Sequence, residues 1–597
     1  MMPRAPRVPV ADRIAVLLWL AVVAVSLAIY RDSIATLDLR DADDYLRLAQ
    51  VRDLMAGQSW FDITQYRINP ADGGGMMHWS RFIDVQIAAL IWLFGLFLSP
   101  EAAERWAVAL YPPLLVLPLL LLMRRVLDRL GDRWQMIAGL FLTATGVTFL
   151  HYFAPLRIDH HNWQLVLSVA MLWLALGEPT FRRGLAAALV MAAHVEISLE
   201  GFPYLAIFGA LFSLEWLRNP AAERRLEGLA AGLIVFPALW LLIFRGRDSF
   251  RAVHCDSFSL PYATGVAAAA LVLLVGFRLP GFTRCWQRRA LLLAIAGAAG
   301  AGAFLIFGRP CLDGPFGDLE PLVRSYWYDM VMEGRPIWRQ RGGVAAFFLT
   351  PTLVGIGAAF WAWRRARDTQ RAADWHRMLF VLPCSAVLSL LVLRTSAAAH
   401  AYLIPVFAAM GVALWDWSRA RRSALARVGG AMVALTAIPA VDVMLVDKAL
   451  GAISPENAAI LNADKATEAE KGCPSSSALA AFAREPAALA FAPLDIGPSI
   501  LVGTPHSVVA TGHHRNHVAM NRVITAFLSD PAAARPIVQD SGARWLVLCT
   551  RLPEIRNFAR GMPRSLAARL ARGEDIPWLT YEAGLSHSTF RVYRILR

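Results

Sequence analysis

The stretch that decides the fold is Arg157-Ile158-Asp159-His160-His161-Asn162, which lies between two apolar segments of membrane length. Charged and imidazole side chains are costly next to hydrocarbon, so a cluster of them at the end of a membrane span usually marks a functional site. A second polar cluster, Asp41, Asp43 and Asp44, follows the first apolar segment. If both clusters face the same side of a membrane, they can form one metal-binding or catalytic centre.

The composition excludes an ordinary soluble protein. Of the 597 residues, 57% are hydrophobic, and most of the length is arranged in runs of about 20 apolar residues. The net charge of +14 comes from arginines in short loops between these runs, which is the topology signal of membrane proteins and argues against nucleic-acid binding. No small-x-small cleavage site closes the first apolar run, so we expect it to remain as a helix.

The apolar runs predict about thirteen transmembrane helices. Their expected ranges are 14–30, 105–123, 134–150, 163–178, 184–199, 201–217, 226–244, 260–277, 290–307, 343–362, 378–393, 401–417 and 428–446.

Arginine-rich loops predict the orientation of these helices. The loop that contains Arg124, Arg125 and Arg129 should be cytoplasmic, and so should the N-terminus. Only one crossing can then lie between residues 31 and 124, so the apolar segment 84–98 is expected to lie along the membrane surface or to dip in and return. The remaining arginine-rich loops then fall on the cytoplasmic side without further adjustment.

Five features are predicted to face the other side, the periplasm. They are the first loop (31–104), the loop at 151–162, the loops at 245–259 and 308–342, and everything from 447 onward. The acidic cluster and the Asp-His-His turn therefore share one face. The protein is expected in the inner (plasma) membrane.

The chain is predicted to have two domains, a membrane domain at 1–446 and an α/β domain at 447–597. The second part is less apolar and contains strand-like runs at 543–549 and 499–502, with helix-like stretches around 477–490 and 520–540.

Four of the six cysteines are predicted to lie outside the cytoplasm, where disulfides persist. Cys255–Cys311 and Cys473–Cys549 are one plausible pairing, although spacing alone does not fix the connectivity.

The Asp-His-His turn carries the donors of a metal site. Asp159 and His161 are two residues apart on a loop and can reach one ion, and oxygen with imidazole suits Mn²⁺ or Mg²⁺ better than a thiol-preferring metal. The alternative is that the turn only caps two helices.

Farther on, His194, Glu196 and Glu200 either line a donor groove or pair with other polar groups between helices, and we favour the structural pairing.

Several motifs together resemble the catalytic subunits of oligosaccharyltransferases, a family of membrane glycosyltransferases with the GT-C fold. The turn at 157–161 is similar to the Asp-His-His motif in the family's second external loop. Asp41, followed six residues later by Arg47, is similar to its first-loop motif. The segment from Pro70 to His78-Trp79 resembles its Pro-x-Gly…His-Trp element, with looser spacing. The family's topology is also the one that the arginines predict.

The resemblance implies roles for two more residues and completes a predicted site. Glu333 precedes Pro336 as in the family's mobile loop, and Arg394 matches a basic residue that the family uses on the donor phosphates, although a single arginine at a span end is also a common headgroup anchor. Asp43 is expected to face solvent. The expected metal ligands are Asp41, Asp159 and His161, the catalytic carboxylates are Asp41, Asp44, Asp159 and Glu333, with Asp44 as the substitute for Asp41, and the substrate-binding residues are Arg157, Arg394, Arg47, His78, His514 and Arg515.

The C-terminal part departs from the family. The acceptor motif Trp-Trp-Asp-Tyr-Gly is represented only by Pro493-Leu494-Asp495-Ile496-Gly497, and Thr511-Gly-His513-His514-Arg515-Asn516 stands where the family has an Asn-rich stretch. The acceptor is therefore expected to differ from the asparagine sequon.

The resemblance implies transfer of a sugar or oligosaccharide from a polyprenyl phosphate or diphosphate to a protein, lipid or polysaccharide acceptor. One alternative is a GT-C enzyme that moves a single sugar from polyprenyl phosphate to lipid or polysaccharide. A transporter of lipid-linked sugars is disfavoured. Transporters place ionisable groups near the midplane of the membrane and show paired halves, whereas here the polar clusters lie in loops and the halves do not repeat.

Overall fold

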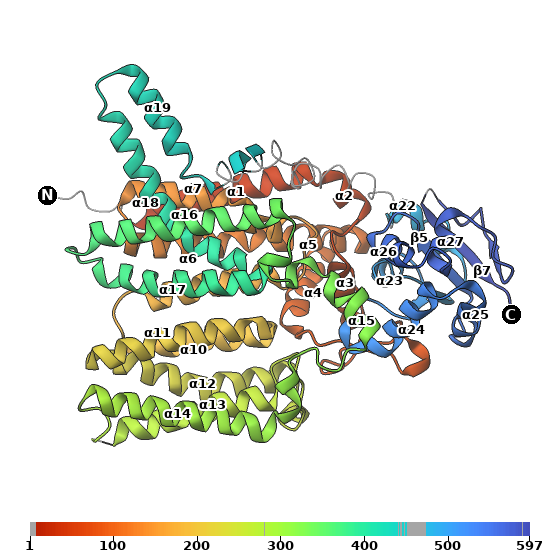
Figure 1. The fold of residues 1–597 in the computed structure, drawn as a ribbon, viewed down its shortest axis with the longest axis horizontal. Helices are drawn as coiled ribbons and strands as arrows, with labels where there is room; N and C mark the ends of the chain where they lie inside the picture. Colours follow the sequence, from red (N-terminus) through yellow and green to blue (C-terminus); the bar gives the residue numbers. More distant parts are fainter. Residues whose placement is uncertain are drawn as a thin grey trace.

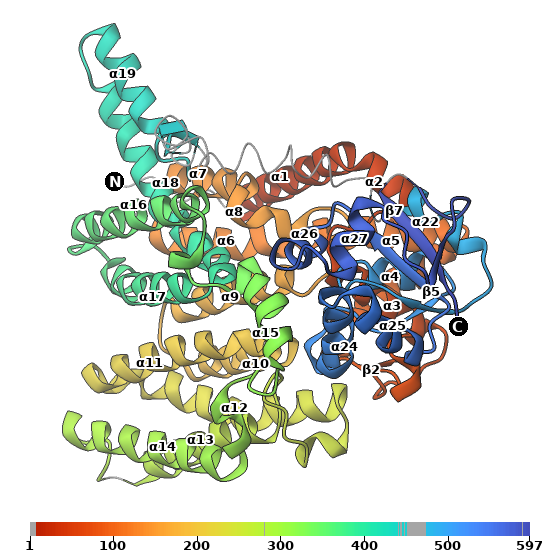
Figure 2. The same cartoon turned by 45° about the vertical axis from the view of Figure 1, so that its right-hand side comes forward.

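The structure is a computed structural model that describes residues 8–279, 281–439, 441, 444–446, 448–449, 473, 475–587 and 589–597. Long helices run side by side in a bundle, and a five-stranded sheet with its own helices lies at one end of that bundle (Figures 1 and 2). The predicted domain boundary between 446 and 447 falls where residue 447 and the stretch 450–472 lie outside the described residues.

The bundle is built from the apolar runs, because a backbone in hydrocarbon can satisfy its hydrogen bonds within a helix. Its helices are α1 (Val8–Ile29), α5 (Pro100–Leu114), α6 (Val116–Leu130), α7 (Arg133–Ala144), α8 (Val147–Leu150), α9 (His161–Ala175), α10 (Phe181–Ile197), α11 (Phe202–Arg218), α12 (Glu223–Phe244), α13 (Leu260–Arg278), α14 (Trp286–Phe307), α16 (Gly342–Ala366), α17 (Ala372–Leu391), α18 (Ser396–Arg419) and α19 (Ala424–Leu435).

Seven helices among the described residues are long and apolar enough to cross a membrane, or eight if the bent pair 133–144 and 147–153 forms one span. About thirteen crossings were predicted. Part of the difference comes from shorter helices, since α9 has 15 residues and α10 and α11 have 17 each. The last predicted span, 428–446, includes residues 440, 442 and 443, which the structure does not describe.

The loop at 31–104, called the first external loop after its predicted side, contains α2 (Arg31–Thr36), α3 (Ala42–Met55), the short strands β1 (Thr64–Gln65) and β2 (Gly75–Met76), and α4 (Arg81–Gly95). Helix α4 covers most of the apolar segment that was predicted to lie along or dip into the membrane. It lies at the end of the bundle nearest the sheet (Figure 1) and is followed directly by α5.

The sheet has the strand order β4-β3-β5-β7-β6, with β3, β4 and β5 parallel and β7 antiparallel to β5 and β6. The sequence predicted β5 and the helical region 520–540. Its strands are β3 (Leu489–Phe491), β4 (Ser507–Val508), β5 (Trp545–Cys549), β6 (Leu579–Tyr581) and β7 (Phe590–Ile595), and its helices are α22 (Ser476–Leu479), α23 (Gly497–Gly503), α24 (His517–Leu528), α25 (Pro531–Asp540), α26 (Pro553–Gly561) and α27 (Leu566–Arg572).

Two local predictions in this part are wrong. The run 499–502 is helix α23 and not a strand, because Pro498 opens a helix whose Ile500 and Leu501 are buried, so tertiary burial overrides their strand preference. The stretch 477–490 is helical only in its first part and ends in strand β3.

Alternate residues of β5 face opposite cores, as a strand buried on both sides requires. Leu546 and Leu548 pack into the core that contains α24 to α27, whereas Trp545 and Val547 pack into a second core. That second core includes Trp79 of the first external loop.

The first external loop continues the sheet beyond β4. Ile68 forms a parallel bridge with Val508, whose backbone N–H donates to the carbonyl of Arg67 (2.9 Å) and whose carbonyl accepts from the N–H of Asn69 (2.8 Å). The side chains of Ile68, Met77 and Trp79 share one core with the sheet. The loop after α1 and the C-terminal part thus form one folded unit.

Both predicted disulfides, Cys255–Cys311 and Cys473–Cys549, are confirmed, and Cys285 and Cys384 are free. The first bridge joins the loops at 245–259 and 308–342. The second ties the start of the C-terminal part to β5.

We expect Cys473→Ser to destabilise the C-terminal part by about 2–4 kcal/mol, because the bridge closes a loop of 76 residues. Urea denaturation monitored by limited proteolysis of this part should show an earlier transition. Cys384→Ser, which removes a free thiol, is the matched control. Equal midpoints for the Cys473→Ser variant and the parent would contradict the expectation.

Candidate active site

Helix α3 brings the acidic cluster to the Asp-His-His turn. Asp41 is the N-cap of α3: its Oδ1 accepts the backbone N–H of Asp43 (3.3 Å), and its Oδ2 lies 2.6 Å from Nη1 of Arg157. Carboxylates at a helix N-terminus are favoured by the helix dipole and by the free N–H groups of the first turn. This ion pair therefore joins the first loop to the second.

Asp44 is bonded to the Asp-His-His turn through both carboxylate oxygens. Its side chain is fully buried, its Oδ1 accepts the backbone N–H of Asp159 (3.0 Å), and its Oδ2 lies 3.2 Å from Nη1 of Arg157. Burial, opposed by the charge of Arg157, raises the pKa of Asp44 to about 7. The geometry makes Asp44 a positioning residue, because both of its oxygens are bonded to the turn.

Asp159, His160 and His161 form a buried group that can hold a metal ion, with one ligand atom from each within 4.8 Å of the others. Oδ1 of Asp159 lies 2.5 Å from Nδ1 of His160, and Oδ2 lies 3.2 Å from Nε2 of His161. Burial would raise the pKa of Asp159, but the two imidazoles and Arg157 lower it well below its usual value. Asp159 is therefore expected to be ionised and able to bind a metal ion.

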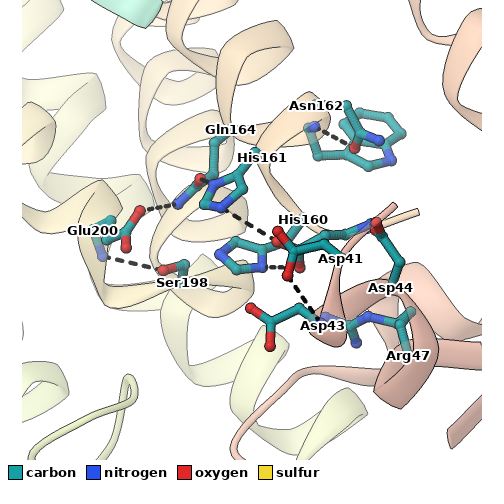
Figure 3. Close-up of polar contacts among 12 residues, drawn as sticks. Asp41, Asp43, Asp44, Arg47, His160, His161, Asn162, Gln164, Ser198 and Glu200 are labelled. Atoms are coloured by element: carbon teal, nitrogen blue, oxygen red, sulfur yellow. Dashed lines mark hydrogen bonds and ion pairs between the residues drawn. The ribbon is translucent and has the colours of Figure 1, made fainter. Parts of the chain in front are cut away.

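Asp43 was expected to face solvent, but it is half-buried and its carboxylate lies beside the ring of His160 (Figure 3). Burial, and then the carboxylates of Asp159, Asp41 and Glu333, raise the pKa of Asp43 well above its usual value. Several carboxylates thus gather at one place.

This donor set fits a divalent cation. Oδ2 of Asp159 is buried and accepts no hydrogen bond from any residue that the structure describes. A cation there would satisfy that oxygen and would reduce the repulsion between Asp159, Asp43 and Asp41. Carboxylate oxygens with one or two imidazoles suit Mn²⁺ better than Mg²⁺, which favours all-oxygen sites.

A cavity lies beside the metal-ligand group. Arg394 and Glu200 face each other there at 2.6 Å, and Nε2 of Gln164 donates to Glu200 (3.0 Å). Gln164 also meets Nδ1 of His161 at 2.8 Å, so Arg394 is connected to the Asp-His-His turn through two side chains. The cavity is lined by Tyr152, His161, Gln164, Leu165, Ser168, His194, Glu200, Tyr204, Arg394, Thr395, Ala397 and Ala398.

Glu333 reaches the same place from the loop at 308–342, in the short turn Met332–Gly334. Its Oε1 lies 3.6 Å from Nη1 of Arg394 and 3.8 Å from Nε2 of His161, and its side chain is 37% exposed. A half-exposed carboxylate on a loop can close over the cavity when a substrate enters.

Four of the residues predicted to bind substrate lie elsewhere. Arg47 is not placed to reach a substrate, because it is 1% exposed, pairs with Asp84 (3.0 Å) and stacks on Trp79. Its sequence position on α3 turns it away from the acidic N-terminus and into the core. The other three lie in a separate cluster: His78, His514 and Arg515.

No protein-family model and no curated protein sequence matches this chain. Among solved structures, the Archaeoglobus fulgidus oligosaccharyltransferase in the apo form is similar, with a TM-score of 0.62 and 14% identity over 95% of this chain and 73% of that one. The chain has the oligosaccharyltransferase fold. Archaeal AglB of the same organism, in complex with an inhibitory peptide and a dolichol-phosphate, gives 0.60 at 13% identity over 95% and 72%. The A. fulgidus enzyme in complex with Zn and sulfate gives 0.58 at 13% over 97% and 73%.

Within this oligosaccharyltransferase fold, sequence reasoning missed several residues of the cavity. Structural pairing was favoured for Glu200 and Glu196. Both are paired, Glu196 with Arg245 at 2.9 Å and Glu200 with Arg394 at 2.6 Å, but Glu200 also lines the cavity. Glu200 follows the end of α10 in a separate turn, so the helical spacing that grouped the two glutamates does not apply. Gln164, one turn after His161 on α9, carried a usable signal because residues three apart share a helix face.

Proposed function

We propose that this chain is a membrane glycosyltransferase that transfers a sugar or oligosaccharide from a polyprenyl phosphate or diphosphate to an acceptor. The site is proposed to face the extracytoplasmic side of the inner (plasma) membrane, with the N-terminus in the cytoplasm. The convergence of Asp159 and His161, the α3 carboxylates, Arg394 and Glu333 supports this function most strongly. The fold shared with oligosaccharyltransferases adds support.

The reaction would displace the lipid phosphate from the anomeric carbon of the sugar. The phosphate oxygens gain negative charge as that bond breaks, and a guanidinium aimed at them stabilises the charge where water is excluded. Arg394 is proposed to bind those oxygens, which requires it to exchange its contact with Glu200 for the donor. Glu333 is proposed to orient the acceptor and to accept its proton.

Asp159 and His161 are proposed to hold Mn²⁺ or Mg²⁺, with the third ligand from Asp43 or Asp41. A divalent cation supplies Lewis-acid stabilisation of the leaving phosphate. Arg157 is proposed to keep the acidic cluster and the turn together, since it pairs with Asp41 at 2.6 Å and with Asp44 at 3.2 Å.

The segment 493–497, which resembles the family's acceptor motif only in part, favours a second candidate, transfer of one sugar to a lipid or polysaccharide. In the segment 493–497, Leu494 and Ile496 are buried and only Asp495 is exposed. The aromatic residues of the peptide-binding motif are missing there, so recognition of an asparagine sequon is not supported.

Mass spectrometry of cells with and without this protein would test the proposed function. Glycolipids, polysaccharides and glycoproteins from both should be compared, and one of these three classes is expected to lose its glycan while the lipid-linked donor accumulates. Loss of transport without accumulation of donor, or identical glycans in both cells, would refute the proposal.

We expect chelation to inactivate the purified enzyme. EDTA should lower transfer of a labelled glycan at least about a hundred-fold, because the ligated cation carries much of the charge stabilisation. Mn²⁺ should restore it, and Mg²⁺ should do so less well. Full activity in EDTA would show a metal-free reaction in which a carboxylate acts as the general base.

A further inference from the structure

Three histidines from distant parts of the chain lie together outside the cavity. His78 comes from the first external loop, and His513 and His514 come from the segment between β4 and α24. The ring centroids of the three pairs are 4.8 to 5.0 Å apart, with the rings of His513 and His514 stacked. One ring nitrogen from each lies within 4.8 Å of the other two.

We propose that His78, His513 and His514 bind a second metal ion, of the class that prefers imidazole nitrogen, with Zn²⁺ as the expected occupant. Imidazole nitrogens are ligands of intermediate softness, and three of them together suit Zn²⁺. The group around Asp159 differs because it is rich in carboxylate oxygens. The proposed ion is therefore distinct from the one at the proposed active site.

The two ring nitrogens of His513 have different surroundings. Nδ1 of His513 is buried and has no hydrogen-bond partner in the part of the chain that the structure describes, although His513 is only 4% exposed. Its other nitrogen, Nε2, lies 2.8 Å from Nδ1 of His78. Two ring nitrogens that face each other at this distance need a proton or a cation between them, and Zn²⁺ is a cation that both can bind.

A carboxylate orients the third histidine. Oδ2 of Asp256 lies 2.7 Å from Nε2 of His514, and Arg515 holds the same carboxylate through Nε (2.6 Å) and Nη2 (2.8 Å). When Nε2–H of His514 donates to Asp256, the lone pair stands on Nδ1, where it can bind a metal. Histidine ligands of zinc commonly donate their other N–H to a carboxylate in this manner.

A modest movement would complete the site. Bonds of about 2.0 Å to a tetrahedral ion place two nitrogens about 3.3 Å apart. His78 and His513 are at 2.8 Å, so their nitrogens need to separate by roughly half an ångström, within reach of a small rotation of the rings. A water molecule can supply the fourth ligand.

The position of the cluster gives the ion a structural role. His78 belongs to the first loop, His513 and His514 to the C-terminal part, and Asp256 to the loop that Cys255 joins to Cys311. An ion here would fasten three extracytoplasmic segments to one another. Zinc bound by the folded chain alone stabilises that fold by mass action.

Zinc titration of the purified full chain tests the proposal. An Asp159→Asn background removes a ligand of the proposed active site, and a chelating dye reports free Zn²⁺. One Zn²⁺ per chain is expected, and His513→Ala should weaken its binding at least about a hundred-fold. His517→Ala is the matched control, because that imidazole begins α24 just after the cluster but bonds Glu320. Co²⁺ in place of Zn²⁺ should give the visible absorption of a tetrahedral site, lost in His513→Ala.

Folding is checked by circular dichroism and gel filtration without metal. If His513→Ala misfolds, His78→Gln and His514→Gln carry the test, since each removes one ligand and keeps a polar group. No bound Zn²⁺ at micromolar free metal in the Asp159→Asn background would overturn the proposal, as would equal affinity in folded ligand variants. Activity is not the readout, so this outcome is independent of the proposed transferase function.

Discussion

Replacing Asp159 with asparagine is expected to lower glycan transfer by about 10²- to 10³-fold, roughly 3–4 kcal/mol of transition-state stabilisation, while the protein still accumulates in the membrane. The side chain keeps its shape but loses the charge that faces His160 and His161 at 2.5 and 3.2 Å. The backbone N–H of residue 159 still donates to Asp44, so the turn should keep its place.

The measurement is transfer of labelled glycan by purified enzyme at equal protein amounts. Asp248→Asn is the matched control, because Asp248 is an exposed carboxylate in the loop at 245–259. Normal transfer by Asp159→Asn would remove the case for a centre at this turn.

Arg394→Lys is expected to lower kcat/KM for the donor about 10- to 100-fold, although it keeps the positive charge. The guanidinium can bind two phosphate oxygens at once, whereas an ammonium acts as a point charge. Arg394 lies 2.6 Å from Glu200 and 3.6 Å from Glu333, so a shorter reach should disturb both contacts. Arg394→Ala should lose more, because it leaves Glu200 without its cation.

Kinetics at several donor concentrations separate binding from chemistry. A phosphate-binding role predicts that KM for the donor rises and that kcat falls with it. Arg341→Lys, at an exposed arginine on the same loop as Glu333, should leave both constants unchanged. If Arg394 were only a lipid-headgroup anchor, Arg394→Lys would behave like that control.

The sequence predicts those features of the fold that depend on patterns of neighbouring residues. Arginine loops and apolar runs placed Asp159 and the α3 carboxylates on one face, and the structure brings them together. The apolar, strand-like run at 543–549 identified β5, and the four cysteines predicted to lie outside the cytoplasm made both disulfides plausible.

The remaining features depend on packing between distant segments. Arg47 follows the family spacing, yet its partner Asp84 lies 37 positions away and draws it into the core. Asp43 was expected in solvent because nothing in the sequence shows that Asp159 and Glu333 lie close to it. The cluster of His78 with His513 needs the C-terminal part to dock on the first loop, which no local pattern reports.

The docking of β4 on Ile68 has a consequence for synthesis. Arg67 donates hydrogen bonds to the carbonyl of Leu501, which is 434 positions later in the chain. At ordinary translation rates of about 5–20 residues per second, roughly 20 to 90 s pass between the emergence of the two partners from the ribosome. Through that interval the apolar side chains around Met77 and Trp79 lack their final cover, so this part of the nascent chain is the expected first binding site for a chaperone.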